Sequence, residues 1–409
     1  MRFELGLFCV VAAAACGGDD ATSRGPVRVT VTAGEAPVAG LTAVFLDPAG
    51  AELARAVTDQ SGQASAEVGE GAALTVVQRF SYGVRLWTVS GLEPGDDISI
   101  DDVIWGQPAG SMTVSFPAPD GDIGDFALHH ACSSSVSGVP TMQADFFSQC
   151  ARERVDFLVE ETGGEQFLHL LDVPLVDGES VTIPGDASSW QPTRLVGAAM
   201  RGPGLDQVLL EWRVESANGT WYGDGLSEGG DEQRAFHLPA GFGVRSRAML
   251  STTTESGGRF HQRRQDRVYP GLADEVLIDV SDPGFLPSVD GASLAPDSQV
   301  VDVDVSGEGD WDMTMLLADF TSGGGDDVLW DIAAPSGTTR IELAALLPAD
   351  LHELLPAADQ TGALASLVAV DGDGSVLRRA PWSPREALEA ARPGDAYILQ
   401  TSTSGTSGE

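Results

Sequence analysis

After its first 25 residues or so, the chain places hydrophobic and polar side chains in short alternating runs. In the stretch VRVTVTA, Val27, Val29 and Val31 share one face of an extended strand, because successive side chains of a strand point to opposite faces. Similar runs follow, separated by Gly, Pro and Asp, at a spacing of about ten residues, which is typical of β-sandwiches and barrels. The pattern therefore predicts an all-β chain.

The same pattern continues towards the C-terminus. Strands are predicted at Arg154–Glu160 and Gln166–Leu171, and the stretches VVDVDVS and MTMLLADF predict strands in the last part. SPREALEAARPG predicts a helix, with Ser383 as N-cap, Pro384 in the first turn and a Pro-Gly stop. PADLHELLP predicts one further short helical turn. The expected fold is a series of tandem β-sandwiches, Ig-like or transthyretin-like, with one or two short helices in the C-terminal part.

Turn-rich stretches and changes in composition suggest where one unit ends and the next begins. The expected segments are a signal peptide (1–15), a lipid anchor and tether (16–26), a first β-sandwich (27–106), a second β-sandwich with a disulfide (107–185), a third β-rich domain (186–282), a C-terminal β-rich domain (283–400) and a disordered tail (401–409).

A weak internal echo supports a repeated architecture. LWTVSGLEPGDDISI, from Leu86, aligns with LLDVPLVDGESVTI, from Leu170, and GLADEVLIDV, ending at Val280, repeats the last part. Each stretch is expected to close a sandwich with a turn and an edge strand. True repetition and convergent hairpin patterns both explain the echo.

The first predicted sandwich resembles a known family. The stretch PVAGLTAVFLDPAGAELARAVTDQSGQASAEV is similar to the carboxypeptidase regulatory-like (transthyretin-like) β-sandwich, over roughly residues 26–105. The matching positions are Pro37, Gly40, Gly50, Thr58, Asp59 and Gly62. The resemblance implies a non-catalytic module with an accessory, display or adhesion role.

The N-terminus predicts export. Arg2 precedes an apolar run from Leu5 to Ala15, too short for the roughly 20 residues that span a bilayer, and such a run is typical of a secretory signal. Three alanines then lead directly to Cys16, which resembles a bacterial lipoprotein signal and implies lipidation of Cys16. An ordinary cleaved signal with an incidental cysteine is the alternative. Gly17 after the cysteine implies the outer membrane or cell surface by the same resemblance.

The remaining cysteines predict one disulfide. Cys9 leaves with the signal, so Cys132 and Cys150 form a single pair in an exported chain, where oxidation is expected. A zinc site needs more ligands at closer spacing, and a redox pair usually has the spacing C-x-x-C. The first half of the intervening stretch, SSSVSGVP, is expected to be a loop, whereas Met142, Phe146 and Phe147 are expected to be buried.

Charge excludes several partners. The 409 residues contain 61 acidic and 23 basic side chains, the basic ones all arginine, for a net charge of −38. Nucleic-acid binding requires basic side chains that neutralise phosphates, so it is excluded, as is adsorption to anionic lipid. Attachment to a membrane is expected only through the lipid anchor, and a protein or polysaccharide ligand is left open.

No metalloprotease or phosphate-binding motif is present. The chain has no H-E-x-x-H and no phosphate-binding glycine loop. His129 and His130 are adjacent and would face opposite sides of a strand; Cys132 and Ser133 lie nearby, but no local acid completes a triad. A carboxylate pair of the kind used in glycoside hydrolysis stays open.

Two Asp-rich stretches and the tryptophans are candidate binding elements. DGDIGD at Asp120–Asp125 and DGDGS at Asp371–Ser375 are partial calcium loops that lack the closing glutamate, and Asp-Gly is also a common hairpin signal. The eight tryptophans are spread singly along the chain, which favours core positions over a sugar-binding platform. No cofactor and no metal site are predicted.

The sequence therefore predicts an exported, lipid-anchored, non-enzymatic protein of the cell envelope that acts as a binding, adhesion or structural module. A hydrolase of envelope or environmental polymers, with the first sandwich as an accessory domain, is the alternative. A sensor or assembly factor for a larger envelope complex is a third possibility.

Overall fold

The structure is a computed structural model of the chain. It describes residues 24–33, 36–81, 83–101, 108–119, 125–147, 150–162, 166–201, 208–227, 233–239, 241–256, 259–270, 275–279, 288–295, 299–306, 310–370 and 397–404. These residues form strands in several sheets, with three short 3₁₀ helices. The predicted all-β class is confirmed.

The first unit is a sandwich of two layers. One layer contains β1 (Gly25–Ala33), β2 (Ala36–Pro37), β5 (Gln63–Val68) and β8 (Asp97–Asp101), and the other contains β3 (Thr42–Leu46), β4 (Glu52–Val57), β6 (Ala72–Phe80) and β7 (Gly83–Leu92). Val27, Val29 and Val31 are fully buried between the layers, against Phe45 and Trp87. The predicted inward face of the first strand is therefore correct.

The second unit is also a sandwich. One layer contains β9 (Pro108–Ser115), β12 (Thr141–Phe147) and β15 (Ser180–Thr182), and the other contains β10 (Phe126–His130), β11 (Ser133–Ser137), β13 (Arg154–Glu161) and β14 (Gln166–Pro174). Its core includes Phe126, Phe146, Phe157 and Trp190. The 3₁₀ helix η1 (Ala187–Ser189) follows, capped by Asp186.

The rest of the chain forms two further groups of strands. The third group contains β16 (Gln191–Arg201), β17 (Val208–Glu215), β18 (Trp221–Ser227), β19 (Gln233–Pro239), β20 (Arg245–Ser256), β21 (Arg259–Pro270) and β22 (Glu275–Asp279). The last group contains β23 (Ser288–Ala295), β24 (Val300–Ser306), β25 (Met313–Ser322), β26 (Asp327–Pro335), β27 (Arg340–Glu342), η2 (Leu343–Leu346), η3 (Ala349–Leu354), β28 (Pro356–Val370) and β29 (Tyr397–Ser404).

The structure tests some of the expectations about the C-terminal part. The short helical turn in PADLHELLP is present as η3, whereas the helix expected after Ser383 lies outside the described residues. Strand β29 extends to Ser404 and pairs with β21 and β28, so the first four residues of the expected disordered tail belong to a sheet. The domain boundaries stay a proposal.

The sequence echo corresponds to a shared strand pairing. In each of the first three groups, the last strand returns to lie parallel to the first: β8 beside β1, β15 beside β9 and β22 beside β16. The three echoed stretches therefore form the same closing element, the edge strand that the sequence predicts.

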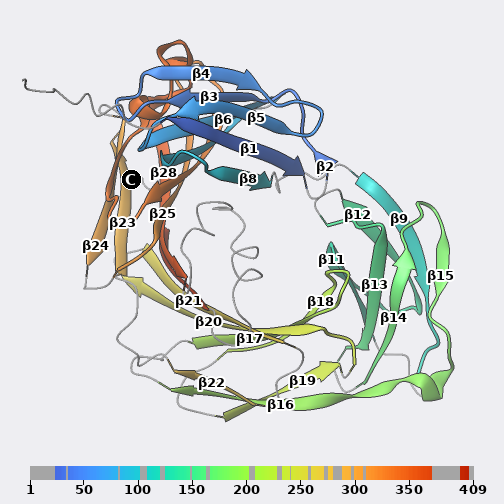
Figure 1. The fold of residues 1–409 in the computed structure, drawn as a ribbon. Coiled ribbons are helices and arrows are strands. Elements are labelled where there is room, and N and C mark those ends of the chain that lie inside the picture. Colours follow the sequence, from blue (N-terminus) through green and yellow to red (C-terminus); the bar gives the residue numbers. More distant parts are fainter. Residues whose placement is uncertain are drawn as a thin grey trace, which may run out of the picture.

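The first and last groups join through one sheet. Strand β26 pairs with β7 in parallel, from Val328↔Val84 to Ala333↔Val89, within a 12-stranded sheet that runs from β18 to β4. Figure 1 shows the result: the chain passes from the first unit (blue) through the second (green) and third (yellow-green), and the last group (orange) returns to β7. The sheet of β3, β6 and β7 is consequently covered on both faces, one of them by η2.

Candidate functional site at the edge of the second sandwich

The histidine pair lies on β10 and faces two different environments, as the sequence predicts. His129 Nε2 lies 3.2 Å from Glu160 Oε1, and its ring meets the edge of Tyr222. The His130 ring lies in the core beside Phe146, 4.9 Å between centroids, and is 1% exposed. The two histidines therefore do not share one site.

Among the described residues, His130 makes a contact that resembles part of a catalytic triad. Its Nε2 lies 3.0 Å from Ser133 Oγ. Burial lowers the pKa of His130 to about 4, so the imidazole is neutral near pH 7. Its Nδ1 is buried and has no hydrogen-bond partner among the described residues. In a nucleophilic triad that nitrogen donates to an orienting acid, so the described residues here supply a serine and a histidine without the third member.

The disulfide predicted from the sequence is present. Cys132 and Cys150 are bonded, with Cα atoms 5.1 Å apart. Cys132 lies directly before β11, and Cys150 lies shortly after β12. The Phe147 amide also donates to Cys132 Sγ, and the Cys150 amide donates to the Phe147 carbonyl. The covalent link thus encloses two consecutive strands.

The stretch inside the disulfide differs from the prediction in two respects. Ser133–Ser137 is strand β11, paired with β10, where a loop was expected. Met142 and Phe146 are buried as predicted, but Phe147 is 37% exposed. Strand β12 alternates between buried and exposed positions, and the period of two places Phe146 inside and Phe147 outside. Four of the five residues of β11 are serine, so the segment lacks the apolar alternation that predicts a strand.

Strands β11 and β12 both lie at the ends of their sheets. The sheet orders are β11-β10-β13-β14 and β12-β9-β15, so both layers of the second sandwich end on strands that the disulfide encloses. Strand β12 contains Asp145, whereas β11 contains only Ser and Val. Natural edge strands are usually protected by charge, proline or short length. Among terminal strands of five or more residues in the described sheets, β11 alone contains no charged residue and no proline.

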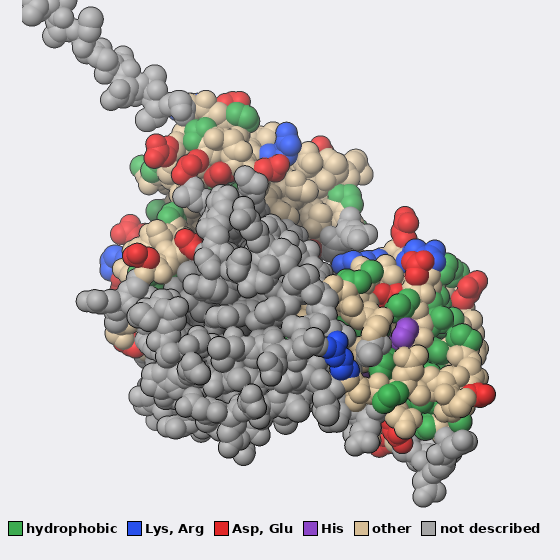
Figure 2. Space-filling view, turned by 60° about the horizontal axis from the view of Figure 1, so that its bottom comes forward, with side chains coloured by type: hydrophobic (Ala, Val, Ile, Leu, Met, Phe, Trp, Pro, Cys, Tyr) green, Lys and Arg blue, Asp and Glu red, His purple; other side chains and the backbone are tan. Residues whose placement is uncertain are grey.

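Apolar side chains also concentrate on the second unit. Seven large hydrophobic residues of the described chain are strongly exposed, and five belong to this unit: Val136, Val139, Phe147, Leu171 and Val176. Figure 2 shows green side chains gathering over the part on the right, which is the second unit. Val136 on β11 is the most exposed, at 65%. Val136, Val139 and Phe147 lie on or next to the two edge strands that the disulfide encloses, so the edge with the least charge also has exposed apolar side chains.

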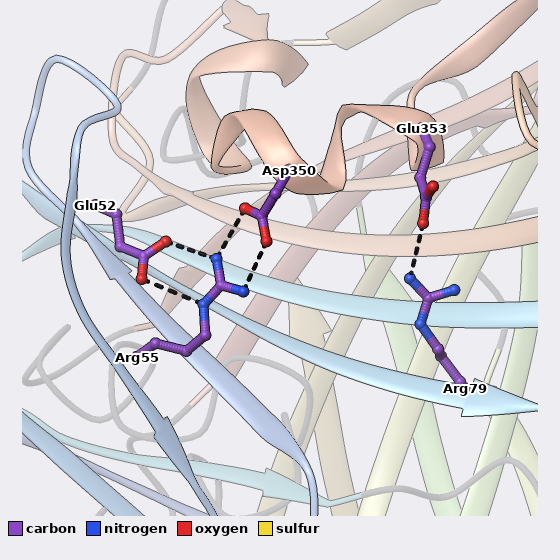
Figure 3. Close-up of polar contacts among 5 residues, drawn as sticks. All are labelled: Glu52, Arg55, Arg79, Asp350 and Glu353. Atoms are coloured by element: carbon purple, nitrogen blue, oxygen red, sulfur yellow. Dashed lines mark hydrogen bonds and ion pairs between the residues drawn. The ribbon is translucent and has the colours of Figure 1, made fainter.

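Other polar clusters serve as joints between the units. Figure 3 shows Arg55 on β4, whose guanidinium makes two 2.8 Å bonds to Asp350 of η3 and further bonds to Glu52. Arg79 donates one hydrogen bond of 3.2 Å to Glu353, another residue of η3. The Arg55 hydrogen bonds lower the pKa of Asp350. These side chains are exposed, and exposed ion pairs contribute little stability.

The buried part of this joint is a chain of hydrogen bonds. The Trp330 indole donates to Thr88 Oγ1 at 2.9 Å, the two threonine hydroxyls of Thr88 and Thr75 lie 2.7 Å apart, and Thr75 donates to the Leu346 carbonyl. Two glycines permit the close approach. Gly50 has φ +84° and Gly91 has φ +71°, and a Cβ at Gly91 would lie 2.2 Å from Pro335. Neither role was visible in the sequence.

A buried carboxylate joins the second and third groups. Asp156, 1% exposed, accepts bonds from the Asp172 amide (2.6 Å) and from the amide and side chain of Asn218 (3.2 and 2.9 Å). Thr220 donates to the Asp156 carbonyl. Asp172 has a φ of 62°. All four polar contacts are structural, since each is made with another group of the chain.

The tryptophans occupy cores where they are described. Trp87, Trp190, Trp212 and Trp330 are buried, and Trp311 packs against the last core. The Trp221 ring lies under Arg213, 4.6 Å from its guanidinium carbon. Trp105 and Trp382 lie outside the described residues. The described tryptophans therefore give no row of exposed rings for a sugar.

Several predicted features fall outside the described part. Cys16, the calcium-like stretch at Asp371–Ser375 and all of Asp120–Asp125 except Asp125 are not described. Within the residues that are described, His, Cys, Asp and Glu side chains form no group of three suited to a metal ion. None of the described helices has the length and apolar character needed to cross a bilayer.

Comparison with known proteins gives no family. No protein-family model and no curated protein matches the chain. Among solved structures it is similar to the Bacillus anthracis TIE protein (10% identity, TM-score 0.17, 63% of this chain and 50% of that one). It is also similar to GBS52, a minor pilin of Streptococcus agalactiae (10% identity, TM-score 0.18, 40% and 94%). The chain spans half the length of the first of these, and similarity at this level does not transfer a function.

Proposed function

We propose that the protein is an exported, non-enzymatic binding module of the cell envelope. The observation that supports this function is the edge strand β11: it is uncharged, lies at the end of its sheet and is enclosed by the disulfide. An exposed strand edge binds an extended segment through main-chain hydrogen bonds. Such a surface needs no catalytic group, and it favours a protein ligand over a polysaccharide.

The location is part of the same proposal. Lipidation of Cys16 would attach the module to the outer membrane or cell surface, and residues 17–26 would act as a tether. The first sandwich is proposed as an accessory module related to the carboxypeptidase regulatory-like fold. Intact-mass analysis of the membrane fraction tests the anchor: we expect the mature chain to begin at a lipid-modified Cys16, and Cys16→Ser to release it. An unmodified mature N-terminus beyond Cys16 would contradict the anchor.

The hydrolase alternative rests on the contact between His130 and Ser133. Its test is turnover of ester, peptide and envelope-polymer substrates by the purified chain and by Ser133→Ala. We expect no turnover that the substitution abolishes, because the described residues provide no acid to orient His130. Turnover that disappears with Ser133→Ala would establish an enzyme and overturn the non-enzymatic proposal.

A further inference from the structure

We infer that β11 accepts an extended segment of another protein that contains basic side chains, and that the segment continues the β11-β10-β13-β14 sheet as its next strand. This inference rests on the proposed function and names the partner. The strand offers five residues, Ser133–Ser137, and pairs on one side only, with β10, in the described sheets. Its other side presents main-chain groups that an added strand would satisfy.

The disulfide prepares this edge for binding. Cys132 precedes β11 immediately, and its bond to Cys150 holds the return of the chain after β12. The first residue of β11, Ser133, is also hydrogen-bonded through its side chain to the buried His130. An edge that is already ordered loses less conformational entropy when a partner binds, so more of the interaction free energy appears as affinity.

The surrounding charge selects a basic partner. Asp125 lies directly before β10, and its carboxylate lies beside Gly138, which follows β11. Asp145 is exposed on β12, the neighbouring edge strand, and His130 is neutral at pH 7 because burial lowers its pKa. Complementary charge accelerates association and discriminates among partners.

A second copy of the chain is disfavoured as the occupant. Edge-to-edge pairing of two β11 strands would bring together two edges that each have Asp125 and Asp145 nearby, in chains of net charge −38. Like charges brought together at an interface oppose association. The side chains that project from the added strand beside Val136 (65% exposed) and Val139 (55% exposed) are expected to be apolar, so the partner alternates basic and apolar residues.

The test uses a short synthetic peptide that alternates valine and arginine, titrated onto the full chain by fluorescence anisotropy. Val136→Lys places a charge on the edge, and Val57→Lys is the matched control, because Val57 lies on the edge strand β4 with a similar exposure of 60%. We expect Val136→Lys to weaken binding about tenfold or more and Val57→Lys to leave it nearly unchanged. Ser134→Lys, at another exposed position of β11, should act like Val136→Lys.

A second pair of peptides separates strand addition from simple attraction to an acidic protein. A peptide of the same charge with a central proline should bind much more weakly, because proline removes a ladder donor, and a valine–glutamate peptide should not bind. Equal binding of the proline peptide, or equal weakening by both lysine variants, would overturn the inference. A dimer of the free chain that Val136→Lys dissociates would also overturn it, by making a second copy the occupant. Failure of the peptide tests would overturn this inference alone. The proposed function is tested separately, by the lipid anchor at Cys16 and by substrate turnover.

Discussion

Acidification from pH 7.5 to 5 should weaken the second sandwich through His130. The folded-state pKa of this histidine is lowered to about 4, first by burial and then by the nearby His129, while Asp145 opposes the shift. An unfolded histidine has a pKa near 6.5. Between these values the unfolded chain binds a proton that the folded chain does not, so stability is lost as the pH falls from 6.5 towards 4.

The magnitude follows from the two pKa values. At 1.36 kcal/mol for each unit, the interval from 6.5 down to pH 5 gives a loss of about 2 kcal/mol. Other groups of the chain also contribute to the dependence of stability on pH, so the comparison is made with His130→Gln. This variant keeps a side chain that can bond to Ser133 but does not titrate, and every other titrating group is common to both proteins.

Hydrogen exchange measured by mass spectrometry reports the free energy of opening for peptides from β10, β12 and β13. The exchange rates are corrected for the intrinsic rate at each pH. Between pH 7.5 and 5, the free energy of opening should fall by about 2 kcal/mol more in the wild-type chain than in His130→Gln. An equal loss in the two proteins would refute the reasoning, since it would mean that His130 is not held neutral by the core.

Three further changes test the joints and the disulfide. Asp156→Ala leaves three N–H groups without an acceptor and should lower the free energy of unfolding by about 3 kcal/mol in urea titrations; a change below about 1 kcal/mol would argue against the buried joint. Thr88→Val removes the acceptor of the Trp330 indole and should cost about 1–3 kcal/mol, measured as faster exchange in β7 and β26. Replacing Cys132 and Cys150 with alanine should destabilise the second unit by about 2–5 kcal/mol, with the first unit as internal control because its core between the two layers contains no residue of the second; unchanged exchange in β10–β13 would contradict the disulfide's role.

The sequence predicts strands well where one face is buried. Val27, Val29 and Val31 alternate with polar residues, and the structure buries all three. The sequence does not predict strands that lack a buried apolar face. Strand β11 has a single valine among serines and pairs with β10, and this pairing leaves no local pattern in the sequence.

The joint between the first and last groups was missed for a different reason. In the sequence, the joint is marked only by a strand that lacks alternation. Ala72–Val77 is buried at every position, as expected for a strand covered on both faces. That pattern could have indicated a second covering layer. It could not have named the partner, because Thr88 and Trp330 are 242 residues apart and long-range pairing is not encoded in a local window.

For the candidate site, the disulfide and the opposite orientation of His129 and His130 could both be predicted from the sequence. It did not indicate that the disulfide encloses two edge strands, because sheet order depends on which strands of the finished fold have neighbours. Lack of charge on Ser133–Ser137 is visible in the sequence, but it becomes informative only when the segment is known to be an edge.

The most direct test of a binding module that works through β11 is amide hydrogen exchange of residues 133–137 with and without the valine–arginine peptide. The amides of β11 that face away from β10 are unpaired in the described sheets, and an added strand would give them acceptors. We predict slower exchange in this segment when the peptide is present and no change in the control edge Glu52–Val57. Saturating peptide that leaves the exchange of residues 133–137 unchanged would contradict the central claim.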